Sequence, residues 1–159
     1  MDGGGASERE LLLFDLGGRS YAVPSSDVVE LVRAVAVRSL PTGPRVVAGV
    51  MNLRGRLVPV FDLLIRFEMP SPPLEPTEQF IVARAGERLV AVRTDRATRL
   101  VNVPASDIEE AAGVVSGTRY LSGIVKLPDG IALIHDLGAF LSEAEGATLD
   151  RAMSAAEAS

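Results

Sequence analysis

The first apolar positions of the chain form two short runs on either side of a Gly-Gly pair, at residues 11–16 and 19–23. Short apolar runs around such a turn predict a β-hairpin. Farther on, residues 28–35 are β-branched and apolar, which favours another strand after a turn at 24–27. The amino-terminal part of the chain therefore predicts strands rather than helices.

A second pair of apolar runs covers residues 46–53 and 56–63, with a turn near Gly55. This pattern predicts a second hairpin. The segment 69–76 that follows has four prolines in eight residues. Because proline fixes φ and lacks an amide hydrogen, this segment is expected to be neither a regular helix nor a central strand. It divides the chain almost in half.

The sequences on either side of this connector repeat one another, at an offset of 69 residues for the first hairpin and strand and 74 for the second hairpin. The spacing from the repeated glycine to the repeated aspartate is the same in both halves. The identical pairs are Gly17/Gly86, Arg19/Arg88, Ala22/Ala91, Val23/Val92, Leu31/Leu100, Val32/Val101, Gly49/Gly123, Leu53/Leu127, Asp62/Asp136 and Leu63/Leu137.

Each half thus predicts a hairpin, a strand, a turn and a second hairpin. Five short twisted strands can curl into a small barrel that leaves few exposed edges. We therefore expect an all-β fold of two five-stranded barrels related by the repeat. The first barrel is expected at about residues 10–69, the connector at 70–76 and the second barrel at about 77–136.

The two ends of the chain have patterns of their own. Residues 1–9 are Gly-rich and polar and are expected to be disordered. The spacing of Leu137, Phe140 and Leu141 predicts a short terminal helix at 136–144. Residues 145–159 are Ala-rich with few large apolar groups, so we expect a frayed helix or tail that can be removed without unfolding the domain.

Composition narrows the classes of function. The 159 residues are 47% apolar and carry 16 basic and 21 acidic groups, a net charge of −5 without a basic cluster, which disfavours a nucleic-acid partner. The absence of cysteine and the single histidine exclude disulfides, thiolate metal sites and multi-histidine sites. No signal peptide and no membrane-length apolar run is found, so we expect a cytoplasmic protein without membrane insertion or cofactors.

Candidate catalytic residues are few. His135 precedes Asp136 in a β-type run, where neighbouring side chains point to opposite faces, so a His–Asp dyad is disfavoured. Asp62 and Asp136 could form a carboxylate pair, but they are repeat equivalents and are better explained by a strand-end or helix-capping role in each half. No convergent set of acid, base and oxyanion donors is apparent.

The second hairpin carries a specific motif. The stretch from Gly49 to Leu63, GVMNLRGRLVPVFDL, resembles the signature G-V-x-N-L-R-G-x-x-x-P-V-x-D-L of the CheW family of bacterial chemotaxis coupling proteins. The order of the flanking segments is also similar to that family, and the resemblance covers about residues 10–142. It implies two SH3-like barrels with a hydrophobic seam between them.

The same resemblance implies a non-enzymatic adaptor, monomeric when free, that couples the cytoplasmic tip of chemoreceptors to the regulatory domain of the histidine kinase CheA. Carried over residue by residue, the family's receptor-contact positions are Val28, Glu30, Arg54, Leu100 and Gly123. Kinase contacts are implied only as loops of the second half. An alternative from another class, a small ligand- or RNA-binding barrel, is disfavoured by the acidic charge and the scarcity of aromatic residues.

A comparison of the two halves adds a hypothesis about Glu30 and Arg54. Under the repeat, Glu30 aligns with Arg99 and Arg54 with Pro128, so the barrel scaffold requires neither charge. Charges that the scaffold does not require are candidates for function. We expect the twist of the barrel to bring the two residues together as one functional site; the alternative is that both are solvated surface charges.

Overall fold

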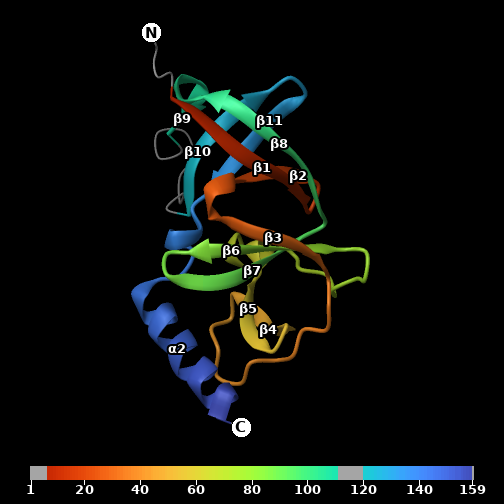
Figure 1. Cartoon of the computed structure of the whole chain (residues 1–159), viewed down its shortest axis with the longest axis vertical. Coiled ribbons are helices and arrows are strands. Elements are labelled where there is room, and N and C mark those ends of the chain that lie inside the picture. The colour runs from red at the N-terminus through yellow and green to blue at the C-terminus, as the bar shows by residue number, and fades with distance from the viewer. Residues whose placement is uncertain (1–6, 111–119, 159) are drawn as a thin grey trace.

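The computed structural model describes residues 7–110 and 120–158, except for the side chain of Thr98. These residues form two strongly curved sheets and a carboxy-terminal helix (Figure 1). The strands are β1 (Glu8–Leu16), β2 (Arg19–Pro24), β3 (Val28–Arg33), β4 (Val47–Leu53), β5 (Arg56–Phe61), β6 (Gln79–Ala85), β7 (Arg88–Thr94), β8 (Arg96–Pro104), β9 (Ile108–Glu109), β10 (Leu121–Leu127) and β11 (Gly130–His135). The helical segments are η1 (Ser25–Asp27), α1 (Leu63–Arg66), η2 (Ala105–Asp107), η4 (Leu137–Ala139) and α2 (Glu143–Ala158).

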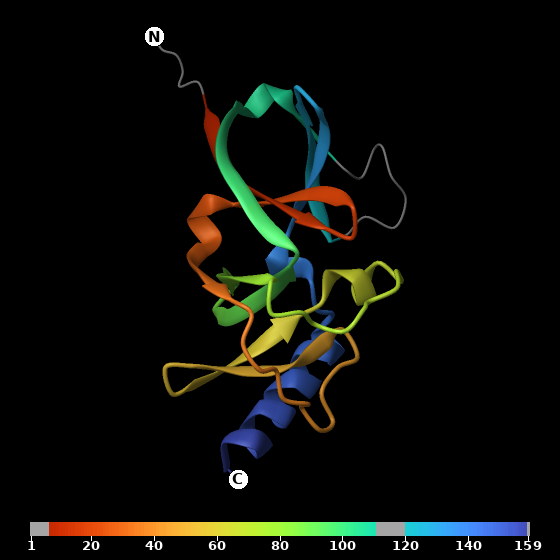
Figure 2. The same cartoon turned by 90° about the vertical axis from the view of Figure 1, so that its right-hand side faces the viewer.

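The predicted hairpins and the all-β fold class are confirmed, and Figure 2 shows the two sheets stacked end to end. We call them the upper barrel, with strand order β8-β1-β2-β11-β10-β9, and the lower barrel, with strand order β3-β6-β7-β5-β4. The connector at 70–76 contains neither helix nor strand, as expected. No helix in the described ranges is long and apolar enough to cross a membrane.

The barrels do not coincide with the two halves of the sequence, which corrects the expected boundaries of 10–69 and 77–136. The hairpin β1–β2 comes from the first half but lies in the upper barrel, and β6–β7 from the second half lies in the lower one. Val60 of β5 pairs with Ala91 of β7, whereas Ile134, the repeat equivalent of Val60, pairs with Ala22. The two halves have therefore exchanged their first hairpins.

Apart from this exchange, the repeat holds in detail. Strand β4 of the lower barrel bulges at Gly49, and β10 of the upper barrel bulges at Gly123. At each glycine the register with the next strand shifts. A β-carbon at Gly49 would lie 2.1 Å from the Arg38 carbonyl oxygen, and one at Gly123 would lie 2.6 Å from Cγ2 of Ile108. A neighbouring backbone segment crosses at both places, so glycine is required by close approach.

Three hydrophobic clusters hold the fold together. One lies in the upper barrel and includes Leu11 and Leu13, and another lies in the lower barrel and includes Met51 and Phe80. The third and largest is the seam between the barrels, where Leu12 of β1 packs. Because successive residues of a strand point to opposite faces, β1 is buried on both sides, which explains its uninterrupted apolar run.

The carboxy terminus differs from the expectation. Residues 137–139 form only a 3₁₀ turn, and the α-helix is α2, which begins at Glu143 and lies along the lower barrel (Figure 1). Leu149 and Ala152 of α2 are buried in the seam cluster, and Arg66 forms an ion pair with Glu145 at 2.6 Å. The helix predicted at 136–144 was therefore misplaced. The segment after it, predicted as a frayed helix or tail, is a docked helix as far as Ala158, because small side chains and distant arginines hold it against the barrel.

The first strand begins inside the amino-terminal segment that was expected to be disordered. Strand β1 begins at Glu8 and pairs with Pro104 of β8. Residues 8 and 9, expected to be disordered, thus belong to the sheet. Residues 1–6, which share that prediction, lie outside the described residues.

Candidate functional site

A groove between the two barrels is bordered by edge strands. Strand β3 ends the order of strands in the lower barrel and β8 ends that of the upper barrel. The groove has a volume of 330 Å³ and is lined by Leu12, Val28, Glu30, Leu31, Ala97, Arg99 and Leu100. Unpaired edges combined with apolar side chains favour association with another chain.

The walls of the groove are unusually apolar for exposed strands. Leu100 is 58% exposed and Leu31 is 44% exposed, and Val29 on the same strand as Leu31 is half exposed. Leu31 and Leu100 are equivalent in the internal repeat, so the pseudo-symmetry of the fold places one leucine on each wall. Large leucines left in water on both sides of a hollow indicate a surface that a partner covers.

The groove carries one ion pair at its edge. Nη1 of Arg54 donates to Oε1 of Glu30 at 3.3 Å, and Nη2 contacts Oε2. This hydrogen bond and the charge of Glu30 raise the pKa of Arg54. The expected proximity of these two residues is confirmed, although they lie 24 positions apart in sequence.

Local backbone geometry directs Arg54 toward its partner. Arg54 and Gly55 both have positive φ, 50° and 89°, which is the two-residue turn that suits the twist of a hairpin. The side-chain oxygen of Asn52 accepts a hydrogen bond from the Gly55 amide at 2.7 Å and fixes this turn. The motif Asn-Leu-Arg-Gly therefore builds a rigid tip that presents the guanidinium to β3.

Of the five residues implied as receptor contacts, the structure brings four together. Val28, Glu30 and Leu100 line the groove, and Arg54 joins it through Glu30. Gly123 lies apart, on β10 of the upper barrel, where its close approach to Ile108 and to the carbonyl of Glu109 gives it a structural role. Sequence reasoning missed Leu31 and Arg99 as groove residues, although the identity of Leu31 and Leu100 in the repeat pointed to both walls.

The candidate catalytic aspartates have structural partners. Oδ1 of Asp62 accepts from the amides of Leu64 and Ile65 and caps α1, as the capping hypothesis predicted. Its other oxygen accepts from Ser71 at 2.6 Å and from Arg93, which also binds Glu78. Asp136 occupies the corresponding N-cap of η4 without a side-chain hydrogen bond.

The single histidine is buried and is not placed to act as a general base. His135 has no exposed surface and packs its ring against Phe67 and Phe140. Burial lowers its pKa to about 3, so the imidazole is neutral near pH 7.

Comparisons with known proteins agree on one family. The sequence model of the CheW-like domain matches residues 10–145. The chain is 29% identical to the chemotaxis protein CheW of Klebsiella aerogenes, covering 89% of this chain and 87% of that protein. It is 30% identical to the protein FrzA of Myxococcus xanthus, covering 75% of each. The crystal structure of the scaffolding protein TtCheW from Thermoanaerobacter tengcongensis superposes with a TM-score of 0.78 at 24% identity, covering 86% of this chain and 94% of that one, and shows the same fold.

Proposed function

This chain belongs to the family of CheW-like domains, and from that premise we propose that it is a chemotaxis adaptor that couples chemoreceptors to the histidine kinase CheA. Its family is one of scaffold and adaptor proteins, and we propose no catalytic step for it. In this role the protein acts by holding partners in a fixed geometry. The alternative of a ligand- or RNA-binding barrel gains no support from its relatives.

The observation that carries the proposal is the groove between β3 and β8. It gathers Val28, Glu30 and Leu100 on two exposed edge strands and ties Arg54 to them. An apolar floor with one ion pair at its edge suits the side of a receptor helix, because apolar contacts supply affinity and the charges supply register. We place the receptor tip here.

The kinase would bind elsewhere, so that both partners are held at once. We propose that the regulatory domain of CheA contacts loops of the second half of the chain, and that the adaptor acts in the cytoplasm as a monomer recruited to receptor arrays. Gly123 belongs to the second half and shapes β10 where β9 crosses it. Its effect on receptor coupling would then be indirect, through the shape of the upper barrel.

The test uses the purified full-length chain with a chemoreceptor tip fragment and a CheA regulatory domain from the same genome. We expect heat of binding in calorimetry and co-elution with each partner at tens of micromolar, since transient interfaces of about 1,200–2,000 Å² in total give measurable affinity. Absence of binding to both partners at these concentrations would refute the adaptor function.

A charge-swap cycle tests the groove itself. Glu30→Arg and Arg54→Glu should each weaken binding of the tip fragment with little change in melting temperature, because both side chains lie at the surface. The double exchange should restore part of the binding. Lys126→Glu, an exposed cation on β10, is the matched control. Strictly additive effects would mean that the two residues act separately.

A further inference from the structure

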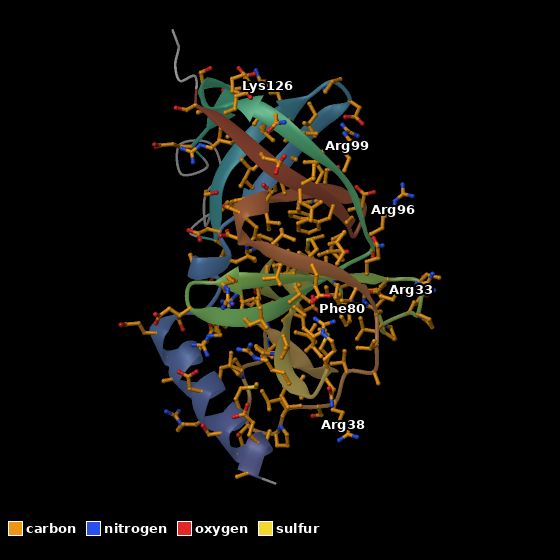
Figure 3. All side chains as sticks on the ribbon, in the orientation of Figure 1. Arg33, Arg38, Phe80, Arg96, Arg99 and Lys126 are labelled. Carbon is orange, nitrogen blue, oxygen red and sulfur yellow. The ribbon has the colours of Figure 1, made fainter. Side chains whose placement is uncertain are left out.

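Three arginines surround the same groove without a comparable number of acids. Arg33, Arg96 and Arg99 project from β3 and β8 on one side of the molecule (Figure 3). All three are exposed. Arg33 and Arg99 make no ion pair with any residue in the described ranges. Arg96 forms a long ion pair with Asp15 at 3.5 Å and keeps 72% of its side chain exposed. Such charges are available to a partner.

These arginines are continuous with the groove. Arg99 lines the groove itself, whereas Arg33 and Arg96 line an adjoining hollow of 620 Å³ that shares Ala97 with it. Gln79 of β6 links the lower barrel to β8 here, because its side-chain oxygen accepts a hydrogen bond from the amide of Ala97 at 2.7 Å. One surface therefore runs from the apolar groove to a basic end.

The acids on this surface are already neutralised. Glu30 lines the groove but pairs with Arg54, and Glu78 lines the adjoining hollow but is buried and pairs with Arg93 at 2.8 Å. The surface is thus locally positive on a chain whose net charge is −5. A negative partner is attracted here and repelled by much of the remaining surface.

We propose that the receptor segment bound in this groove is an amphipathic helix whose apolar stripe covers Leu31 and Leu100 and whose acidic flank faces Arg99, with further acids over Arg33 and Arg96. This inference rests on the proposed function and adds the chemistry of the partner. It also gives the bound helix one direction. The two groove walls are repeat equivalents, but Glu30 with its own arginine stands on one wall and Arg99 on the other, so reversing the helix would move its acidic flank from Arg99 to Glu30.

The experiment measures the affinity of the full-length protein for the receptor tip fragment, as wild type, Arg99→Glu, Arg33→Glu and the control Lys126→Glu. The three substituted side chains are all exposed, and melting temperatures check that each variant is folded. We expect Arg99→Glu and Arg33→Glu to bind about tenfold or more weakly than wild type, and the control to bind within about twofold of it. Wild-type affinity should fall between about 0.05 and 0.3 M NaCl more steeply than that of Arg99→Glu.

A charge exchange on the fragment then identifies the acidic flank. Each Asp or Glu bordering its apolar stripe is replaced by Lys in turn, and one replacement should recover binding of Arg99→Glu while weakening that of the wild type. If the wild type binds but Arg99→Glu and Arg33→Glu bind like the control, the acidic flank is refuted and the adaptor function stands. If the wild type does not bind the fragment, this inference fails, and the adaptor function fails with it when the CheA regulatory domain is not bound either.

Discussion

Replacing Leu149 by alanine tests whether α2 is an integral part of the fold. Leu149 has no exposed surface and belongs to the seam cluster together with Phe61 and Phe140. Truncation to alanine removes three buried carbons, about 2.4 kcal/mol at 0.8 kcal/mol per methylene, and leaves a cavity where α2 meets the seam cluster. We therefore expect the free energy of unfolding to fall by about 3 kcal/mol, within the range of about 2–5 kcal/mol for such changes.

The expected loss is large enough to measure by circular dichroism. For a chain of this size, 1 kcal/mol corresponds to about 2–4 °C, so the melting temperature should fall by about 6–12 °C. Alanine is a better helix former than leucine, so helix propensity alone predicts no loss. Leu100→Ala serves as the matched control, because Leu100 is 58% exposed and its truncation leaves no cavity.

The reasoning would be refuted by a melting temperature that changes by less than about 2 °C in Leu149→Ala while the helical signal persists. That result would mean that α2 folds without support from the seam. A loss equal to that of Leu100→Ala would mean the same. The prediction replaces the expectation from sequence that residues 145–159 can be removed without effect.

Three further changes test other parts of the structure. Gly123→Ala should lower the melting temperature, because its β-carbon would lie 2.6 Å from Cγ2 of Ile108. An unchanged melting temperature would show that β9 shifts to accommodate the methyl group. Gly146→Ala should raise stability by about 0.5–1 kcal/mol in urea unfolding, since this glycine lies inside α2 and the new methyl meets only Arg88 at 3.5 Å. His135 has a folded pKa of about 3 against 6.5 for a free imidazole, so the unfolded chain binds the extra proton between these values. The contribution of His135 to the free energy of unfolding is therefore complete above pH 6.5. It is lost toward pH 3 by up to about 1.4 kcal/mol per pH unit, and His135→Phe should remove this part of the pH dependence.

Local features of the fold were predictable from sequence because their signals are local. The glycine pair before Arg19 and the Arg-Gly step after Leu53 both mark hairpin turns, and both are found. The partner of each hairpin was not predictable. Since Ala22 and Ala91 have the same residue type and are each followed by valine, either could pair with Val60, and only the three-dimensional closure of the seam distinguishes them.

The docking of α2 was missed for a different reason. Hydrophobic patterning detects large side chains, and this helix buries Ala152 beside its single leucine. Its remaining anchors are ion pairs with Arg66 and Arg88, which lie 79 and 62 residues away in sequence. Neither small buried residues nor distant charges leave a periodic signal.

The candidate site was predicted in part. The Glu30–Arg54 pair followed from asking which charges the repeat does not require, and the structure confirms the contact. Arg99 answers the same question, as the residue aligned with Glu30, yet it was not recognised as part of the groove. A sequence does not show that two repeat-equivalent edge strands face each other across a hollow.

The exchange of hairpins also sets the order in which a nascent chain can fold on the ribosome. All five strands of the lower barrel have been synthesised once Thr94 is added, so its core around Met51 and Phe80 can close early. The β1–β2 hairpin, although made first, waits for β11, whose last residue is His135. Until then its side chains that face the core of the upper barrel, such as Leu11, Leu13 and Ala22, stay open to solvent or to chaperones. The part of the chain that is synthesised first is thus among the last to reach its final position.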